Sequence, residues 1–98
     1  MPTFRVSKAT VADLEQIGRY TEHTWGADQR RAYLNGLNDQ FVALSERPLA
    51  APERTEFNPP VRIHHHGKHL IVYIIEDDGI FVLRVLHERM NVPAQLFP

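Results

Sequence analysis

The chain has 98 residues and a formal net charge of −1 at neutral pH, which predicts one small domain without the positive charge of a dedicated nucleic-acid-binding protein. It contains no cysteine, which excludes disulfides, thiolate metal sites and cysteine nucleophiles. The sequence shows neither a signal-peptide pattern nor an apolar run long enough to span a membrane, and we therefore expect a cytoplasmic protein.

The N-terminal segment predicts a short strand followed by a helix. Thr3 to Val6 alternates apolar and polar residues and suits a short edge strand. Thr10 followed by Asp13 three residues later resembles a capping box, and apolar residues then recur at helical spacing. The pattern predicts a helix from about Val11 to Thr24 that ends at Gly26, a residue suited to a helix C-terminus.

A second helix is expected from near Asp28 until shortly before Pro48. Because Gly26 and its neighbours are the only connection, the two helices should fold back on each other as an αα-hairpin. Trp25, at the turn, is expected to be buried, as is usual for tryptophan. Gly36 inside the second helix costs about 1 kcal/mol relative to alanine, which suggests that another element approaches it closely.

The C-terminal half predicts three strands. Residues 49–60 are rich in proline and lack periodicity, which indicates a loop, and a strand begins near Val61. Two apolar runs follow, His69 to Ile75 and Ile80 to Leu86, and both are rich in β-branched and aromatic residues. The Asp78-Gly79 dipeptide between them is a strong hairpin signal, because the central residues of a tight hairpin turn need positive φ.

The predicted order is β-α-α-β-β-β, an α+β fold in which an αα-hairpin packs on one face of an antiparallel sheet. Residues 1–98 form one domain, with 91–98 as a tail in which Leu96 and Phe97 dock on the domain or on another chain. The last two strands are apolar on both faces, and a sheet with one face in water would alternate apolar and polar residues. We therefore expect the helices to cover one face and a partner to cover the other.

Four segments between residues 4 and 91 also match a known family in their amino-acid sequence. They are Ala12 to Ile17 with Tyr20-Thr21, Trp25-Gly26, His69 to Tyr73, and Val85 to Met90. In these segments the chain resembles the ParE branch of the ParE/RelE toxins of bacterial toxin–antitoxin modules. The last segment, an apolar strand running into His-x-Arg-Met, is the most specific.

The resemblance implies a toxin that inhibits DNA gyrase by binding to it and is neutralised by a cognate ParD-like antitoxin in a hetero-oligomer. Such a toxin contacts DNA only indirectly, through gyrase or the antitoxin. An inhibitor that acts by binding has no catalytic residues, cofactor or metal. The candidate partner-binding residues lie on the last strand and at its exit; they are Ile80, Val82, Arg84, Leu86, His87, Arg89 and Met90.

Arg84 interrupts an apolar strand, and strand alternation places it on the face of Ile80, Val82 and Leu86. It either meets an acidic residue of the antitoxin in the partner groove or pairs with a carboxylate of this chain, such as Glu88 or Glu76. Arg89 and Met90, at the strand exit, are the more exposed candidates for contacting gyrase or antitoxin. A capping role for Arg89 is an equal alternative.

The first alternative function is that of the RelE-like relatives, which are ribosome-dependent mRNA endonucleases. RNA cleavage requires a base, an acid and cations for the phosphate. The residues that would supply them are Arg62, His64, His65, His66, His69, Arg84, His87 and Arg89. The RelE pattern, however, relies on several lysines and arginines on the middle strands and on an aromatic residue after the final arginine, and this chain departs from it in both respects. The second alternative is a non-toxic scaffold that acts in a co-repressor complex.

The histidine-rich segment around the Gly67-Lys68 turn also allows a metal interpretation, since imidazole is a common ligand. On a strand, His64 and His66 share a face and His65 points to the opposite one, so at most two converge, with His69 across the turn as a third. No carboxylate lies within the cluster to complete a site. A polar hairpin tip without metal is the favoured interpretation.

Overall fold

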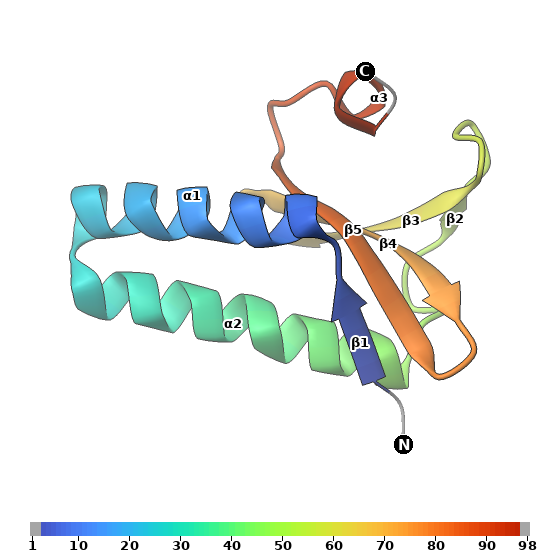
Figure 1. Cartoon of the computed structure of the whole chain (residues 1–98), viewed down its shortest axis with the longest axis horizontal. Helices are drawn as coiled ribbons and strands as arrows, with labels where there is room; N and C mark the ends of the chain where they lie inside the picture. Colours follow the sequence, from blue (N-terminus) through green and yellow to red (C-terminus); the bar gives the residue numbers. More distant parts are fainter. Residues whose placement is uncertain (1–2, 97–98) are drawn as a thin grey trace.

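The computed structural model describes residues 3–96 and shows an α+β fold with an αα-hairpin on one face of a sheet, as predicted (Figure 1). Its elements are β1 (Thr3–Val6), α1 (Lys8–Trp25), α2 (Ala27–Glu46), β2 (Glu53–Arg54), β3 (Val61–His66), β4 (His69–Glu76), β5 (Gly79–His87) and α3 (Val92–Leu96). The strand order is β1-β5-β4-β3-β2. All neighbouring pairs are antiparallel except β1 with β5, which are parallel.

Two short elements lie in segments that were expected to be irregular. β2 belongs to the proline-rich connection and extends the sheet beyond β3. α3 belongs to the tail, where Leu96 docks on the domain, while Phe97 lies outside the described residues. No helix of residues 3–96 is long and apolar enough to cross a membrane.

Helix α1 begins one turn earlier than expected, because Ser7 and not Thr10 is its N-cap. The Ser7 hydroxyl accepts a hydrogen bond from the Thr10 amide at 3.0 Å and donates one to the Leu83 carbonyl at 2.7 Å. Thr10 is fully buried, and its hydroxyl donates to the Val82 carbonyl at 3.0 Å. The first turn of α1 is therefore hydrogen-bonded to β5, at the point where β1 ends.

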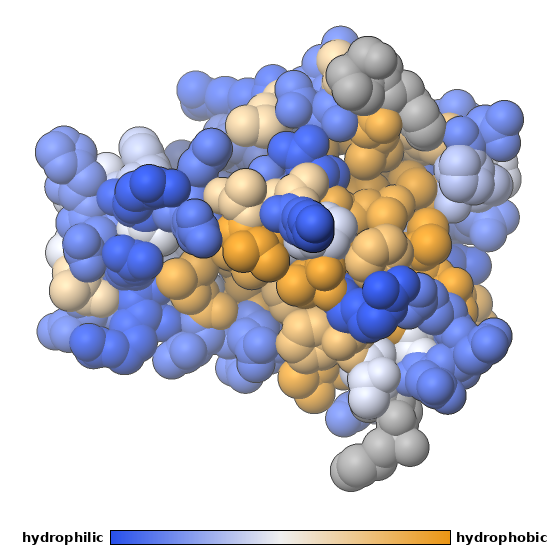
Figure 2. Space-filling view, viewed as in Figure 1, coloured by the Kyte–Doolittle hydropathy of each residue, from blue (hydrophilic) through white to orange (hydrophobic). Residues whose placement is uncertain are grey.

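The two helices cover one face of the sheet and form the main core with it. The buried members of this core include Leu37, Phe41, Ile71, Tyr73, Ile80, Val82 and Val85. Figure 2 shows that hydrophobic residues gather where the helices lie beside the sheet, whereas the far end of the helical hairpin is mostly hydrophilic. His66 lies against Gly36, 3.4 Å from the place of a Cβ atom, so the expected close approach exists, at ordinary van der Waals distance.

The opposite face of the sheet is covered by the chain itself, and the expectation that a partner covers it is wrong. Val72 and Leu86 are buried there beneath Phe57 of the proline-rich connection. Val92 and Leu96 of α3 pack on the same cluster. The sequence pattern showed that both faces must be covered, but the covering residues lie in segments without periodicity.

A β-bulge at Leu83 divides β5 into two halves, and the alternation of side chains between the two faces of the sheet is reversed from one half to the other. Tyr73 of β4 pairs with Val82, but the preceding Val72 pairs with Arg84, so Leu83 is an extra residue on β5. One extra residue reverses the inward and outward alternation of everything that follows it. The expectation that Arg84 shares a face with Ile80, Val82 and Leu86 is therefore wrong: Ile80 and Val82 face the helices, and Arg84 and Leu86 the opposite side.

The β4–β5 hairpin is confirmed, but Gly79 has a different role from the one predicted. Glu76 pairs with Gly79, so the central turn residues are Asp77 and Asp78, and neither has positive φ. Gly79 itself has a φ of +152° and lies against β1, where a Cβ atom would be 1.7 Å from the Thr3 carbonyl oxygen. Glycine is required here by the approach of the parallel strand.

We expect Gly79→Ala to lower the free energy of unfolding by about 3 kcal/mol, because β1 must move away to admit the methyl group. Urea denaturation measures this loss. Asp78→Ala, in the exposed turn, is the matched control and should change the stability by less than about 0.5 kcal/mol. Equal stability of the two variants would show that β1 tolerates displacement at no cost.

Candidate functional site

A groove of about 640 Å³ lies between α1, the end of β5 and the β3–β4 turn. It is lined by Asp13, Gln16, Ile17, Tyr20, Thr21, Trp25, Gln29, Tyr33, Gly67, Lys68, His69, Val85, His87, Arg89 and Met90. The helical hairpin extends past the sheet, which leaves this side of α1 uncovered (Figure 1). We refer to these residues as the groove.

The groove has a buried apolar floor and an exposed aromatic rim. Ile17 and Val85 form the floor and are buried. Tyr20 and Trp25 are 69% and 71% exposed, so the expectation that Trp25 is buried is wrong. Met90 at the exit of β5 is 45% exposed. Exposed aromatic residues and methionine beside a concave apolar surface are typical of protein-binding sites.

One face of α1 supplies most of the helical wall. Asp13, Gln16, Ile17, Tyr20 and Thr21 recur at intervals of three and four residues, which places them on one side of a helix. The apolar spacing that predicts this helix includes Ile17 and Thr21 but not Asp13, Gln16 or Tyr20. The mixture of an acid, an amide and an aromatic residue beside Ile17 is the signal that distinguishes a groove wall from a core face.

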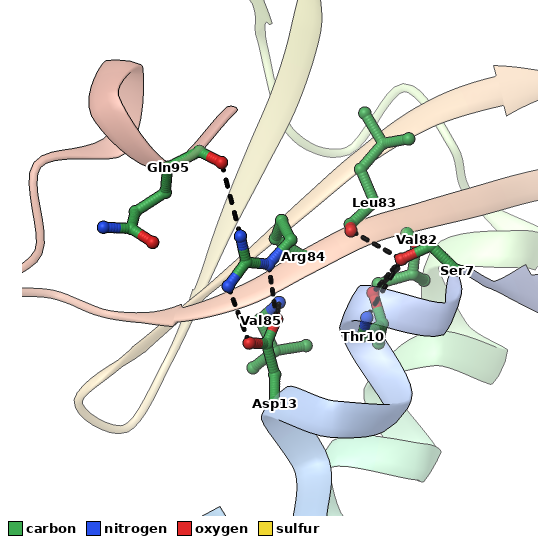
Figure 3. Close-up of polar contacts among 8 residues, drawn as sticks. All are labelled: Ser7, Thr10, Asp13, Val82, Leu83, Arg84, Val85 and Gln95. Atoms are coloured by element: carbon green, nitrogen blue, oxygen red, sulfur yellow. Dashed lines mark hydrogen bonds and ion pairs between the residues drawn. The ribbon is translucent and has the colours of Figure 1, made fainter. Parts of the chain in front are cut away.

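Arg84 is held at the edge of the groove by Asp13 of α1 (Figure 3). Its Nε and Nη2 atoms each donate to one oxygen of the Asp13 carboxylate at 2.8 Å, and Nη1 donates to the Gln95 carbonyl of α3 at 3.3 Å. The hydrogen bond with Asp13 raises the pKa of Arg84. The intrachain partner of Arg84 is thus Asp13, whereas Glu88 or Glu76 had been expected.

The Asp13 carboxylate also continues the hydrogen bonding of the sheet edge. It accepts the Val85 backbone N–H at 3.0 Å (Figure 3), beyond the last β1 partner of β5, which is Val82. The side chains of Asp13 and Arg84 are only 11% and 22% exposed. This pair joins α1, β5 and α3 and belongs to the interior of the domain.

Imidazole and cationic side chains gather at the end of the groove near the β3–β4 turn. The Tyr33 hydroxyl lies 2.6 Å from Nδ1 of His69, and the rings of His69 and His87 meet edge to face at 5.5 Å. Burial and the neighbouring His87 lower the pKa of His69. Lys68 and Arg89 line the same end, and neither forms an ion pair with any of residues 3–96.

The structure distributes the predicted partner-binding residues over four environments. Ile80 and Val82 are buried under the helices, and Leu86 is buried on the opposite face. Arg84 is ion-paired within the chain. Those that line the groove are His87, Arg89 and Met90. The groove residues that sequence reasoning missed as partner contacts are those of the helices and the turn, above all Tyr20, Trp25, Tyr33 and Lys68.

The side chains considered for RNA cleavage do not form one cationic surface. Arg62 donates to the Ala51 carbonyl at 2.6 Å and is close to Glu53. Arg84 is ion-paired with Asp13. Among residues 3–96 no group of three or more histidines, cysteines and carboxylates is placed to hold a metal ion.

Comparison with known proteins identifies the family. The model of the ParE toxin of the type II toxin–antitoxin system parDE matches residues 4–92. The chain belongs to the ParE toxin family. The resemblance found in the sequence is confirmed over nearly the whole domain.

Individual ParE toxins align over almost their full length. Toxin ParE1 of Mycobacterium tuberculosis is 34% identical over 94 residues, which cover 95% of this chain and 96% of that protein. Toxin ParE1 of Caulobacter vibrioides is 29% identical, with 98% and 99% covered. Toxin ParE of Escherichia coli is 28% identical, with 98% and 94% covered.

A solved structure has the same fold. The structure described as the chromosomal ParDE TA system from P. aeruginosa superposes with a TM-score of 0.73 at 17% sequence identity, covering 89% of this chain and 96% of that chain. This ParE-family chain is therefore built on the fold of a solved ParDE structure.

Proposed function

We propose that this ParE-family toxin arrests growth by binding DNA gyrase and that a cognate ParD-like antitoxin neutralises it by occupying the groove. It acts in the cytoplasm as an inhibitor and not as an enzyme. It meets DNA only through gyrase or the antitoxin. His87, Arg89 and Met90, at the exit of β5, are the contacts that the two partners share.

The observation that carries this proposal is the groove itself, in a chain of the ParE family. Its floor is apolar, and its rim carries two aromatic side chains that are more than two thirds exposed. Exposed tryptophan and tyrosine at a concave surface are the residues that most often dominate binding energy between proteins. An amphipathic antitoxin segment that fills the groove would cover them.

The RelE-type alternative is disfavoured because two of the arginines it would need are bound to acceptors within the chain. Stabilising the charge that develops on a cleaved phosphodiester requires cations aimed at the phosphate. Arg62 and Arg84 are bound to acceptors of the chain, which leaves Lys68 and Arg89 as the unpaired cations of the groove. His69 and His87 lie beside them, and two unpaired cations are fewer than the RelE pattern provides.

A supercoiling and DNA-cleavage assay with purified gyrase, run beside a translation assay that scores mRNA cutting, tests the proposal. We expect the toxin to inhibit supercoiling and leave mRNA intact, and an equimolar amount of the antitoxin encoded beside it to restore gyrase activity. A Met90→Asp variant should inhibit gyrase at least about tenfold less. The matched control, Val11→Asp, changes an apolar residue of similar exposure outside the groove and should inhibit fully.

The other outcomes contradict the proposal in distinct ways. Cut mRNA with unaffected gyrase would establish the RelE-type activity. Binding of the antitoxin without any effect on gyrase, translation or growth would establish the non-toxic scaffold.

A further inference from the structure

We propose that the end of the groove formed by Lys68, His69, His87 and Arg89 binds a carboxylate-bearing segment of the antitoxin and takes up protons as it does so. This inference rests on the proposed function, since it names the chemistry of the partner at the same groove. It is carried by the charges and contacts at that end of the groove.

The charge of this site is complementary to an acidic segment. Lys68 and Arg89 are exposed cations without an ion-pair partner among residues 3–96. The one carboxylate that lines the groove, Asp13, is already bound to Arg84 through both of its oxygens. Glu88 also lies near His69 and forms no ion pair with any of residues 3–96, so this end of the groove combines two cations with one free carboxylate and stays net positive, while the chain as a whole is slightly acidic.

A protein segment suits the site better than nucleic acid. A nucleic acid presents one charge per phosphate, and its binding needs a series of cations along the strand. Here two unpaired cations lie beside an apolar floor and a rim of Tyr20, Trp25 and Met90. Such a surface favours a partner that carries a few carboxylates among apolar side chains.

His69 couples this binding to protons. His69 is packed against the Tyr33 hydroxyl and the His87 ring, and burial together with the other imidazoles lowers its pKa in the free toxin. The titratable and charged groups around the two rings are Asp13 from α1, Tyr33 from α2, His66 from β3, Lys68 from the turn, and Glu88 and Arg89 after β5. A carboxylate placed beside the His69 ring stabilises its protonated form. The pKa of His69 then rises on binding, a proton is taken up, and the affinity increases as the pH falls through the histidine range.

Calorimetric titration of the full-length toxin with the full-length antitoxin encoded beside it tests the inference. We expect the dissociation constant to fall about tenfold between about pH 8 and about pH 6, since a rise of about one unit in the pKa of His69 contributes up to that factor. Two buffers of different ionisation enthalpy should reveal net proton uptake near pH 6.5, the ordinary histidine range.

Variants separate the two parts of the inference. The variant His69→Gln should flatten the pH dependence to within about twofold, and His87→Gln, which leaves the contact between Tyr33 and His69 intact, should keep it. Lys68→Gln/Arg89→Gln should weaken binding about tenfold and reduce its salt dependence. The controls His65→Gln and Lys8→Gln change exposed residues outside the groove and should bind as the unchanged chain does.

Each remaining result overturns a definite statement. Affinity that is equal in all variants and at every pH would reject the carboxylate site and leave the proposed function intact. Failure of the antitoxin to bind the unchanged chain would reject the proposed function itself. Displacement of the antitoxin by a single-stranded RNA oligonucleotide, lost in Lys68→Gln/Arg89→Gln, would assign the site to nucleic acid instead.

Discussion

Replacing Asp13 with alanine should lower the free energy of unfolding by about 3 kcal/mol. The change removes the acceptor of two Arg84 donors and of the Val85 N–H, and leaves a largely buried guanidinium without its counter-charge. Urea denaturation monitored by circular dichroism measures the loss as a lower midpoint at an unchanged slope.

Two variants control this experiment. Asp13→Asn keeps an oxygen for the Val85 N–H and loses the charge, so its cost should lie between those of the unchanged chain and Asp13→Ala. Glu15→Ala removes an exposed carboxylate two positions away, whose ion pair with Arg19 spans 3.7 Å, and should cost less than about 1 kcal/mol. A loss as small as this in Asp13→Ala would show that the buried pair is no stronger than a surface pair.

The Asp13 pair also changes how substitutions of Arg84 are interpreted. Arg84→Glu would place a second carboxylate against Asp13 inside the domain. Weaker partner binding by that variant would then report damage to the fold and not a lost contact. Substitutions in the groove rim avoid this ambiguity.

Trp25→Ala should weaken binding of the cognate antitoxin by about 2 kcal/mol, roughly 30-fold, if the antitoxin fills the groove as proposed. Because the Trp25 side chain is largely exposed in the free toxin, the free energy of unfolding should change by less than about 0.5 kcal/mol. Calorimetric titration gives the affinity, and thermal unfolding of the same samples gives the stability.

Val42→Ala is the matched control, since it truncates a partly exposed apolar residue of α2 that does not line the groove. It should bind the antitoxin with unchanged affinity. If Trp25→Ala and Tyr20→Ala both bind as tightly as this control, the antitoxin does not occupy the groove and the partner site lies elsewhere.

The elements with a strong period could be predicted from the sequence, because their burial is decided locally. The alternation around Val61 and the two apolar runs after it predict where β3, β4 and β5 lie in the sequence. The spacing of apolar residues predicts both helices of the hairpin. The fold class follows from their order. His87, Arg89 and Met90, at the exit of β5, line the groove, and their role as partner contacts stays a prediction.

The features that the sequence did not reveal depend on contacts between distant segments. Thr10 and Asp13 have the spacing of a capping box, but the side chains of both form hydrogen bonds with the backbone of β5, more than 70 residues away. Ser7 caps the helix instead. The Leu83 bulge has no local signature, since every neighbouring residue suits a regular strand. Trp25 is exposed because the helical hairpin extends past the sheet, which no pattern within the helix records.

The position of β5 between β1 and β4 has a consequence for the order in which the domain folds. β1 is the first strand to be synthesised, yet its partner in the sheet is the last strand, and Ser7 is bonded to Leu83 across 76 positions of the chain. Contacts between residues so distant in sequence close large loops and form slowly. On the ribosome, β1 can meet α2 early, through Phe4 and Phe41, but β1 and the first turn of α1 lack their hydrogen-bonding partner until β5 has left the exit tunnel. The groove, whose walls are α1 and the end of β5, is complete only after the chain has been made as far as Met90.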